Sequence, residues 1–72
     1  MTLKQAYQEY LRERFNFDEP EEIICYVSDM LDMFAGFLAR TEPYATKAIR
    51  QFEDAAATTY ELMEYLDTEV MQ

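Results

Sequence analysis

The side chains that could carry chemistry are one cysteine and several carboxylates, in a chain without histidine. A catalytic Cys25 would need a nearby cation or imidazole to stabilise its thiolate. At helical spacing its neighbours are Glu22 and Asp29, whose negative charge opposes ionisation of the thiol. We therefore interpret Cys25 as an ordinary thiol at the surface or in an interface. As the only cysteine it cannot form an internal disulfide, which favours a reducing compartment.

Two rows of carboxylates recur at helical spacing and raise the question of a metal: Glu22, Asp29 and Asp32, then Glu61, Glu64 and Asp67. Di-iron bundles pair such carboxylates with histidines that point into the core, and calcium loops follow an Asp-x-Asp-x-Asp-Gly pattern. Neither pattern is present. Gly36 is the only glycine, so no phosphate-binding loop can form. Gly36 either lets the backbone of a partner approach closely or stands at a position that is not optimised for helix stability. We expect no metal, no cofactor and no enzymatic activity.

The size of the chain predicts a single domain over residues 1–72 that needs additional stabilisation. Domains of this size bury only about 60% of the surface that the unfolded chain exposes, and most rely on disulfides, metals or oligomerisation. Oligomerisation is the one of these that the composition leaves open. Half of the residues are apolar and 15% are aromatic, which excludes a disordered acidic tail.

The charge and hydropathy of the chain limit where the protein can be located and which classes of partner it can bind. The first residues contain no apolar signal segment, and no uncharged apolar run approaches the roughly 18 residues of a membrane span. A net charge of −9 argues against direct binding of nucleic acid or anionic membranes. We expect a cytoplasmic protein of a bacterium or of a phage-infected cell.

The local signals predict an all-α fold of three helices. Thr2 and Gln5 form a capping-box pattern at the start of a helix over residues 3–15. Pro20, within an acidic run, begins a second helix over residues 19–40. Apolar side chains occupy about half of the circumference of this second helix, so it must contact neighbours on two sides.

A short turn around Pro43 predicts that residues 43–70 form a third helix, antiparallel to the second. Its apolar side chains alternate at spacings of four and three residues, as in a coiled coil. The central positions of this seam are Ile49, Phe52, Ala56, Thr59, Met63 and Leu66. Because the first helix is too short to cover a third helix of this length, we expect the seam to contribute to a homodimer.

The charges gather in blocks along the chain. Residues 18–39 and 51–72 each carry −6, whereas residues 40–50 carry +2. An antiparallel hairpin would bring eight carboxylates together in an acidic pole, with cations at the opposite end. The eight are Asp18, Glu19, Glu21, Glu22, Glu61, Glu64, Asp67 and Glu69. Three interpretations stay open: solubility, a cationic partner surface, or acid-to-base pairing in an antiparallel homodimer.

These features favour a small non-catalytic protein-interaction module. In its sharper form, the acidic pole occupies a basic, nucleic-acid-binding surface of another protein, because carboxylates three and four residues apart lie about 5–6 Å from one another and can stand in for phosphates. Inhibitors of restriction and CRISPR nucleases from phages and mobile elements offer an analogy. The alternative is a structural subunit that completes a larger helical bundle through apolar faces.

Overall fold

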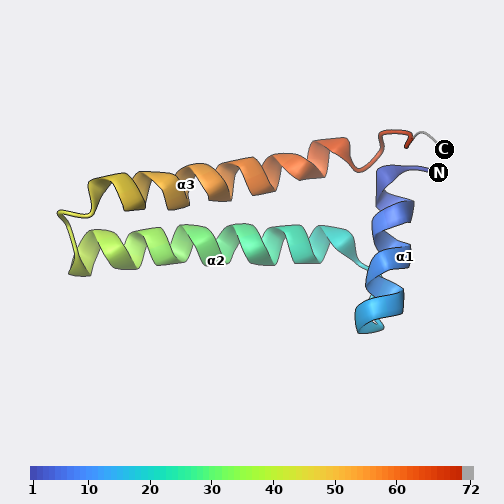
Figure 1. Cartoon of the computed structure of the whole chain (residues 1–72), viewed down its shortest axis with the longest axis horizontal. Helices are drawn as coiled ribbons and strands as arrows, with labels where there is room; N and C mark the ends of the chain where they lie inside the picture. The colour runs from blue at the N-terminus through green and yellow to red at the C-terminus, as the bar shows by residue number, and fades with distance from the viewer. Residues whose placement is uncertain (71–72) are drawn as a thin grey trace.

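The computed structural model describes residues 1–70 and contains three α-helices. These are α1 (Leu3–Phe15), α2 (Pro20–Thr41) and α3 (Thr46–Glu61), followed by a short 3₁₀ helix, η1 (Leu62–Tyr65). Helices α2 and α3 lie side by side, and α1 crosses them at one end (Figure 1). The prediction of an all-helical chain with three helices is confirmed, and the described residues contain no β-strand.

Helix α1 begins and ends at local signals. The Thr2 hydroxyl accepts a hydrogen bond from the Gln5 backbone amide at 3.2 Å, and the Gln5 side chain accepts one from the Thr2 amide at 2.8 Å. This is a complete capping box. At the other end Asn16 has the left-handed φ of 54°, and its amide donates to the Arg12 carbonyl. Asparagine tolerates this conformation better than most residues, so the helix stops there.

The two ends of the described chain are hydrogen-bonded to each other, in what we call the terminal clasp. The Leu3 amide donates to the Thr68 carbonyl at 2.8 Å, and the Lys4 amide donates to the Leu66 carbonyl at 2.8 Å. These two amides belong to the first turn of α1 and have no acceptor within the helix. The clasp therefore satisfies them and fixes α1 against the segment that follows α3.

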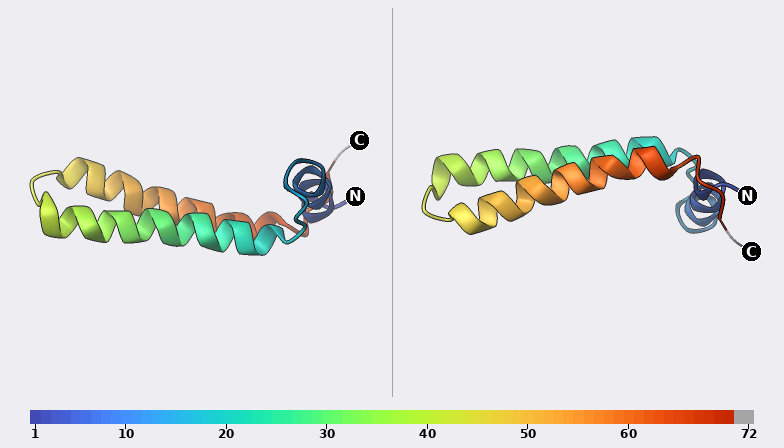
Figure 2. Two further views of the ribbon diagram at one scale, coloured as in Figure 1. Left: turned by 90° about the horizontal axis from the view of Figure 1, so that it is seen from below. Right: turned by 90° about the horizontal axis from the view of Figure 1, so that it is seen from above.

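Small residues set the contact between α2 and α3. The buried Ser28 hydroxyl donates to the Ala56 carbonyl at 2.8 Å, and further along α2 the Phe34 ring packs edge-to-face on Phe52 with centroids 4.9 Å apart. Ala35 is only 1% exposed. Residue numbers rise along α2 while those of their partners fall along α3, so α3 returns beside α2 (Figures 1 and 2).

Helix α3 is shorter than the predicted range of 43–70, which is corrected to Thr46–Glu61. Pro43 lies in the turn, where the Ala45 amide donates to the Glu42 carbonyl at 2.9 Å. At the other end the chain tightens into η1 and then turns toward α1. A continued α-helix would keep its carbonyls for its own amides, whereas here those of residues 66 and 68 accept from α1.

The molecule is elongated, at 46 × 24 × 14 Å, and its core is small. The buried apolar side chains are Leu11, Pro20, Ile24, Ala35, Ala56 and Leu66. Four of these belong to the segments that meet where α1 crosses the other helices. Most large apolar side chains of α2 therefore stay outside the core.

The close contact at Ala56 makes a stability prediction. Ala56→Leu should force α2 and α3 apart and lower the free energy of unfolding by about 1–3 kcal/mol, as overpacking a tight contact does. Urea denaturation followed by circular dichroism measures this. Ala57→Leu adds the same side chain at an exposed position and should change stability far less. Equal losses in the two variants would contradict the packing described here.

Candidate interaction surfaces

One side of α2 exposes a set of apolar side chains, which we call the apolar face. Its six side chains are between 40% and 72% exposed: Tyr26, Val27, Met30, Met33, Phe34 and Phe37. Soluble monomers rarely expose contiguous apolar patches of more than a few hundred Å² unless the patch binds something. The apolar face is therefore a candidate interaction surface.

Most of the apolar face points away from α3, and Phe34 at its edge packs on Phe52 of α3. Ser28 faces α3, and each further residue advances about 100° around a helix. Met30 and Phe37 consequently stand roughly 160–180° from the contact with α3. The sequence pattern required two neighbours for α2, and within the described chain α3 covers one of these sides while the other stays open.

The predicted seam of α3 lies within the molecule. Ala56 and Leu66 are buried, and the remaining seam positions are half-buried: Ile49, Phe52, Thr59 and Met63. The edge-to-face contact with Phe34 and the hydrogen bond from Ser28 show that the seam packs on α2. A second copy could reach these side chains only by opening the helix pair.

A second apolar feature is a groove of about 340 Å³ beside α1, which we call the α1 groove. Its lining comes from three segments, namely α1, the linker and α2: Tyr7, Tyr10, Leu11, Phe15, Phe17 and Ile23. Phe15 is 65% exposed, and its ring packs edge-to-face against Tyr10 with centroids 6.3 Å apart. Sequence periodicity could not reveal this groove, because it combines segments whose relative orientation is not a local property.

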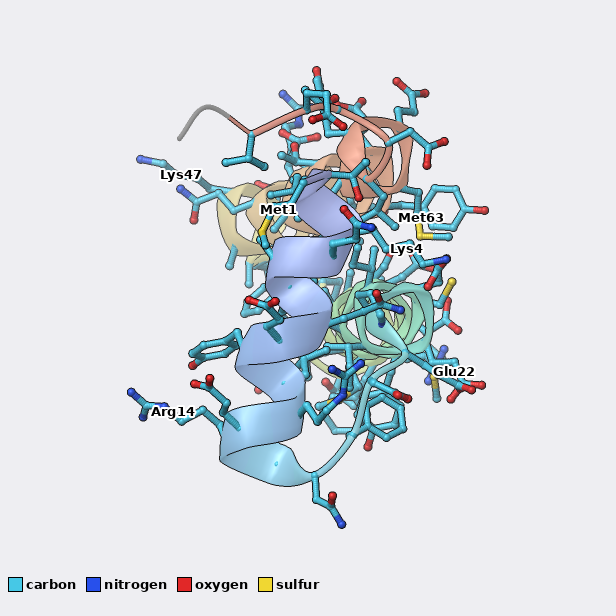
Figure 3. The ribbon with its side chains drawn as sticks, turned by 90° about the vertical axis from the view of Figure 1, so that its right-hand side faces the viewer. Met1, Lys4, Arg14, Glu22, Lys47 and Met63 are labelled. Atoms are coloured by element: carbon cyan, nitrogen blue, oxygen red, sulfur yellow. The ribbon has the colours of Figure 1, made fainter. Side chains whose placement is uncertain are left out.

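The acidic pole forms at the end of the molecule that α1 crosses, and α1 supplies cations to part of it (Figure 3). Lys4 contacts Glu21 at 2.6 Å, and Arg12 contacts Asp18 at 3.6 Å. The chain's amino terminus contacts Glu69 at 3.4 Å. Three of the eight predicted carboxylates thus have a cationic partner.

The cations of α1 differ in what they contact. Arg12 pairs with Asp18, whereas the Arg14 guanidinium lies 5.6 Å from the Tyr10 ring centroid, on the other side of α1 from Glu22 (Figure 3). Lys4, which sequence reasoning missed, is the closest cation. Its position opposite Glu21 depends on how α1 crosses α2, and no local signal reports that crossing.

The protonation behaviour of the acidic pole follows its pairing. The hydrogen bond from Lys4 lowers the pKa of Glu21, and Glu21 raises the pKa of Lys4. Glu19 behaves in the opposite way, because its hydrogen bond with Glu22 and the negative charge of that neighbour raise the pKa of Glu19. Other carboxylates of the pole are exposed: Glu22, Glu61, Glu64 and Asp67. The pole is therefore divided into carboxylates that pair with a cation and, within residues 1–70, unpaired carboxylates, which we call its solvent-facing part.

The opposite end of the molecule is basic. Arg40, Lys47 and Arg50 are exposed there, and within residues 1–70 none of them takes part in an ion pair. Tyr44, in the turn between α2 and α3, is 97% exposed. Within residues 1–70, this end therefore presents unpaired cations and an exposed aromatic ring.

The remaining residues whose side chains could take part in catalysis or metal binding do not form a site. Cys25 is a half-buried free thiol. In the part of the chain that the structure describes, no three or more histidine, cysteine or acidic residues are placed to hold a metal ion. A Cβ at Gly36 would meet only the Arg40 side chain, at an ordinary 3.6 Å, so nothing within residues 1–70 requires glycine there.

The sequence matches no protein-family model, no curated protein and no solved structure. Among the helices of residues 1–70, none has both the length and the apolar character that crossing a membrane demands.

The crowding of Glu19 and Glu22 predicts that Glu19→Gln raises the thermal stability of the protein by an amount that depends on pH. A carboxyl with a raised pKa destabilises the folded protein when it is ionised, so the substitution should raise the melting temperature at neutral pH. The gain should shrink as the pH falls through the raised pKa and vanish below the ordinary value of 4.5.

Thermal melts at low ionic strength from neutral to acid pH measure this, with Glu53→Gln on the exposed surface of α3 as the control. A gain from Glu19→Gln that stays constant across the pH range would show that repulsion between the two carboxylates is not its source.

Proposed function

We propose that this protein is a small, non-catalytic protein-interaction module built on an antiparallel α2–α3 hairpin, and that it forms homodimers through the apolar face of α2. The exposure of that face is the observation that carries the proposal. A large apolar side chain has a surface of about 200 Å², and these six are about half exposed. Together they offer roughly 600 Å² of exposed apolar area. A standard protein interface buries about 800 Å² on each partner, so the apolar face supplies most of one.

The composition of the apolar face supports this use. It contains no charged side chain, and aromatic residues and methionine are enriched in interfaces. Met30 and Met33 are unbranched and flexible, so they can adapt to the surface of a partner. A structural subunit in a larger helical bundle would use the same face, with a different protein in place of the second copy.

A second candidate function rests on the solvent-facing part of the acidic pole. Glu61 and Glu64 are exposed near the end of α3, and within residues 1–70 neither takes part in an ion pair. Their negative charge is also unfavourable at the carboxyl-terminal end of a helix. A sequence that keeps such charges is consistent with docking onto a basic, nucleic-acid-binding surface of a partner protein.

Met33→Asp tests the primary function. Met33 is 72% exposed, so the variant should keep its helical circular dichroism while its self-association falls sharply, because dimerisation would then bury an unpaired charge. Sedimentation equilibrium at micromolar concentration measures the change. Thr58→Asp, which adds the same charge at an exposed position of α3, should leave association unchanged. A wild-type protein that sediments as an 8.6 kDa monomer would contradict the proposed homodimer.

The double substitution Glu61→Lys and Glu64→Lys tests the second candidate. It should stabilise the fold at low salt by about 0.3–1 kcal/mol per site, since it corrects the charge at the end of α3. It should also abolish capture of basic proteins from a lysate, and duplex DNA should compete with that capture for the wild-type protein. Stabilisation with unchanged capture would assign these carboxylates to solubility alone.

A further inference from the structure

We infer that the two copies pair antiparallel along α2, about a two-fold axis that passes between Met30 and Met33 of both helices. In this arrangement Tyr26 of each copy packs against Phe37 of the other, and Glu22 of each copy lies beside Arg40 of the other. The inference rests on the proposed association through the apolar face and adds the direction and register of the pairing.

The central residues of the apolar face form a stripe that is symmetric in sequence. Tyr26, Met30, Met33 and Phe37 follow spacings of four, three and four residues, the repeat of a coiled-coil seam. An aromatic residue stands at each end and a methionine at each inner position, so the stripe has the same pattern when it is reversed. An antiparallel copy can therefore place its side chains in matching layers, as a self-complementary two-fold interface requires.

Spacing alone would also permit a parallel pair, and the charges decide between the two directions. Glu22 and Arg40 lie on the same edge of the stripe, each about 120° from Ser28 around the helix. Parallel pairing would set the acidic poles of the two copies beside each other. Antiparallel pairing sets Glu22 against Arg40, whose guanidinium has no ion-pair partner within residues 1–70.

In the same arrangement, Tyr44 of one copy occupies the α1 groove of the other. Tyr44 and Glu19 are equally far in sequence from the proposed axis, on opposite sides of it. The turn of one copy, with the 97% exposed Tyr44, therefore reaches the start of α2 in the other copy, where the groove lies between Ile23 and Phe15. Lys47 arrives at the same place, near the acids that begin α2. The groove adds apolar area to the roughly 600 Å² of the apolar face, which brings the interface close to the standard size.

Exchanging the charges of Glu22 and Arg40 in the same chain tests the direction of pairing. In the antiparallel dimer, Glu22→Lys places a second cation beside Arg40 at two symmetric sites, and Arg40→Glu places a second carboxylate beside Glu22. Each single variant should raise the dimer dissociation constant by about threefold to tenfold at low salt, and high salt should reduce the effect. The combined variant, Glu22→Lys with Arg40→Glu, should return the constant to near the wild-type value. Glu53→Lys, exposed on α3, is the control for net charge.

Disulfide trapping provides a second measurement, in a Cys25→Ser background. Copies carrying Tyr26→Cys should cross-link with copies carrying Phe37→Cys, whereas neither variant should cross-link with itself. Tyr44→Ala should weaken the dimer without lowering the stability of the monomer, since its side chain is almost fully exposed.

The outcomes separate this inference from the proposed function. In one outcome, Met33→Asp disrupts the dimer, the single charge reversals leave its dissociation constant unchanged, and two Tyr26→Cys copies cross-link with each other. These results would overturn the antiparallel pairing and leave the homodimer intact. A monomer that uses Met33 only to bind a different protein would overturn the pairing and favour the assembly subunit. A monomer that is indifferent to Met33→Asp would overturn both.

Discussion

The close approach of α2 and α3 is the contact on which the rest of the structure depends. Ser28, Ala35 and Ala56 are small and buried, so the two backbones can come near enough for the Ser28 hydroxyl to reach the Ala56 carbonyl. A contact built from small side chains leaves little room for large ones. Most of the bulky residues of α2 consequently stand on its other side, and the apolar face is a result of how the helix pair packs.

Helix α1 is the second constraint, and both polar contacts and its buried Leu11 hold it in position. Its first amides use carbonyls of the segment after α3, and its cations contact acids at the start of α2. Such a short helix is only marginally stable by itself in water. The terminal clasp thus orders α1, and α1 in turn neutralises part of the acidic pole and forms one wall of the α1 groove.

The candidate interaction surfaces are separated according to their chemistry. The apolar face has the length and symmetry for a copy of itself, while Glu61 and Glu64 face solvent beyond the area that α1 covers. In the antiparallel pairing that we infer, the two acidic poles lie at opposite ends of the dimer. Dimerisation and docking to a basic partner would then use different surfaces, and one dimer could present an acidic pole to two partner molecules.

The sequence by itself determined the features that arise within a few residues: the three helices, the capping box at Thr2, the left-handed end at Asn16 and the breadth of the apolar surface on α2. Caps and periodicity act over one or two turns, so they can be read without a fold. Only the tertiary structure decided where α3 ends, that its seam packs on α2, that Lys4 faces Glu21, and that a groove forms beside α1. Each of these depends on side chains or carbonyls far apart in the chain, which meet through the packing of α2 on α3, the crossing of α1 and the hydrogen bonds of the terminal clasp.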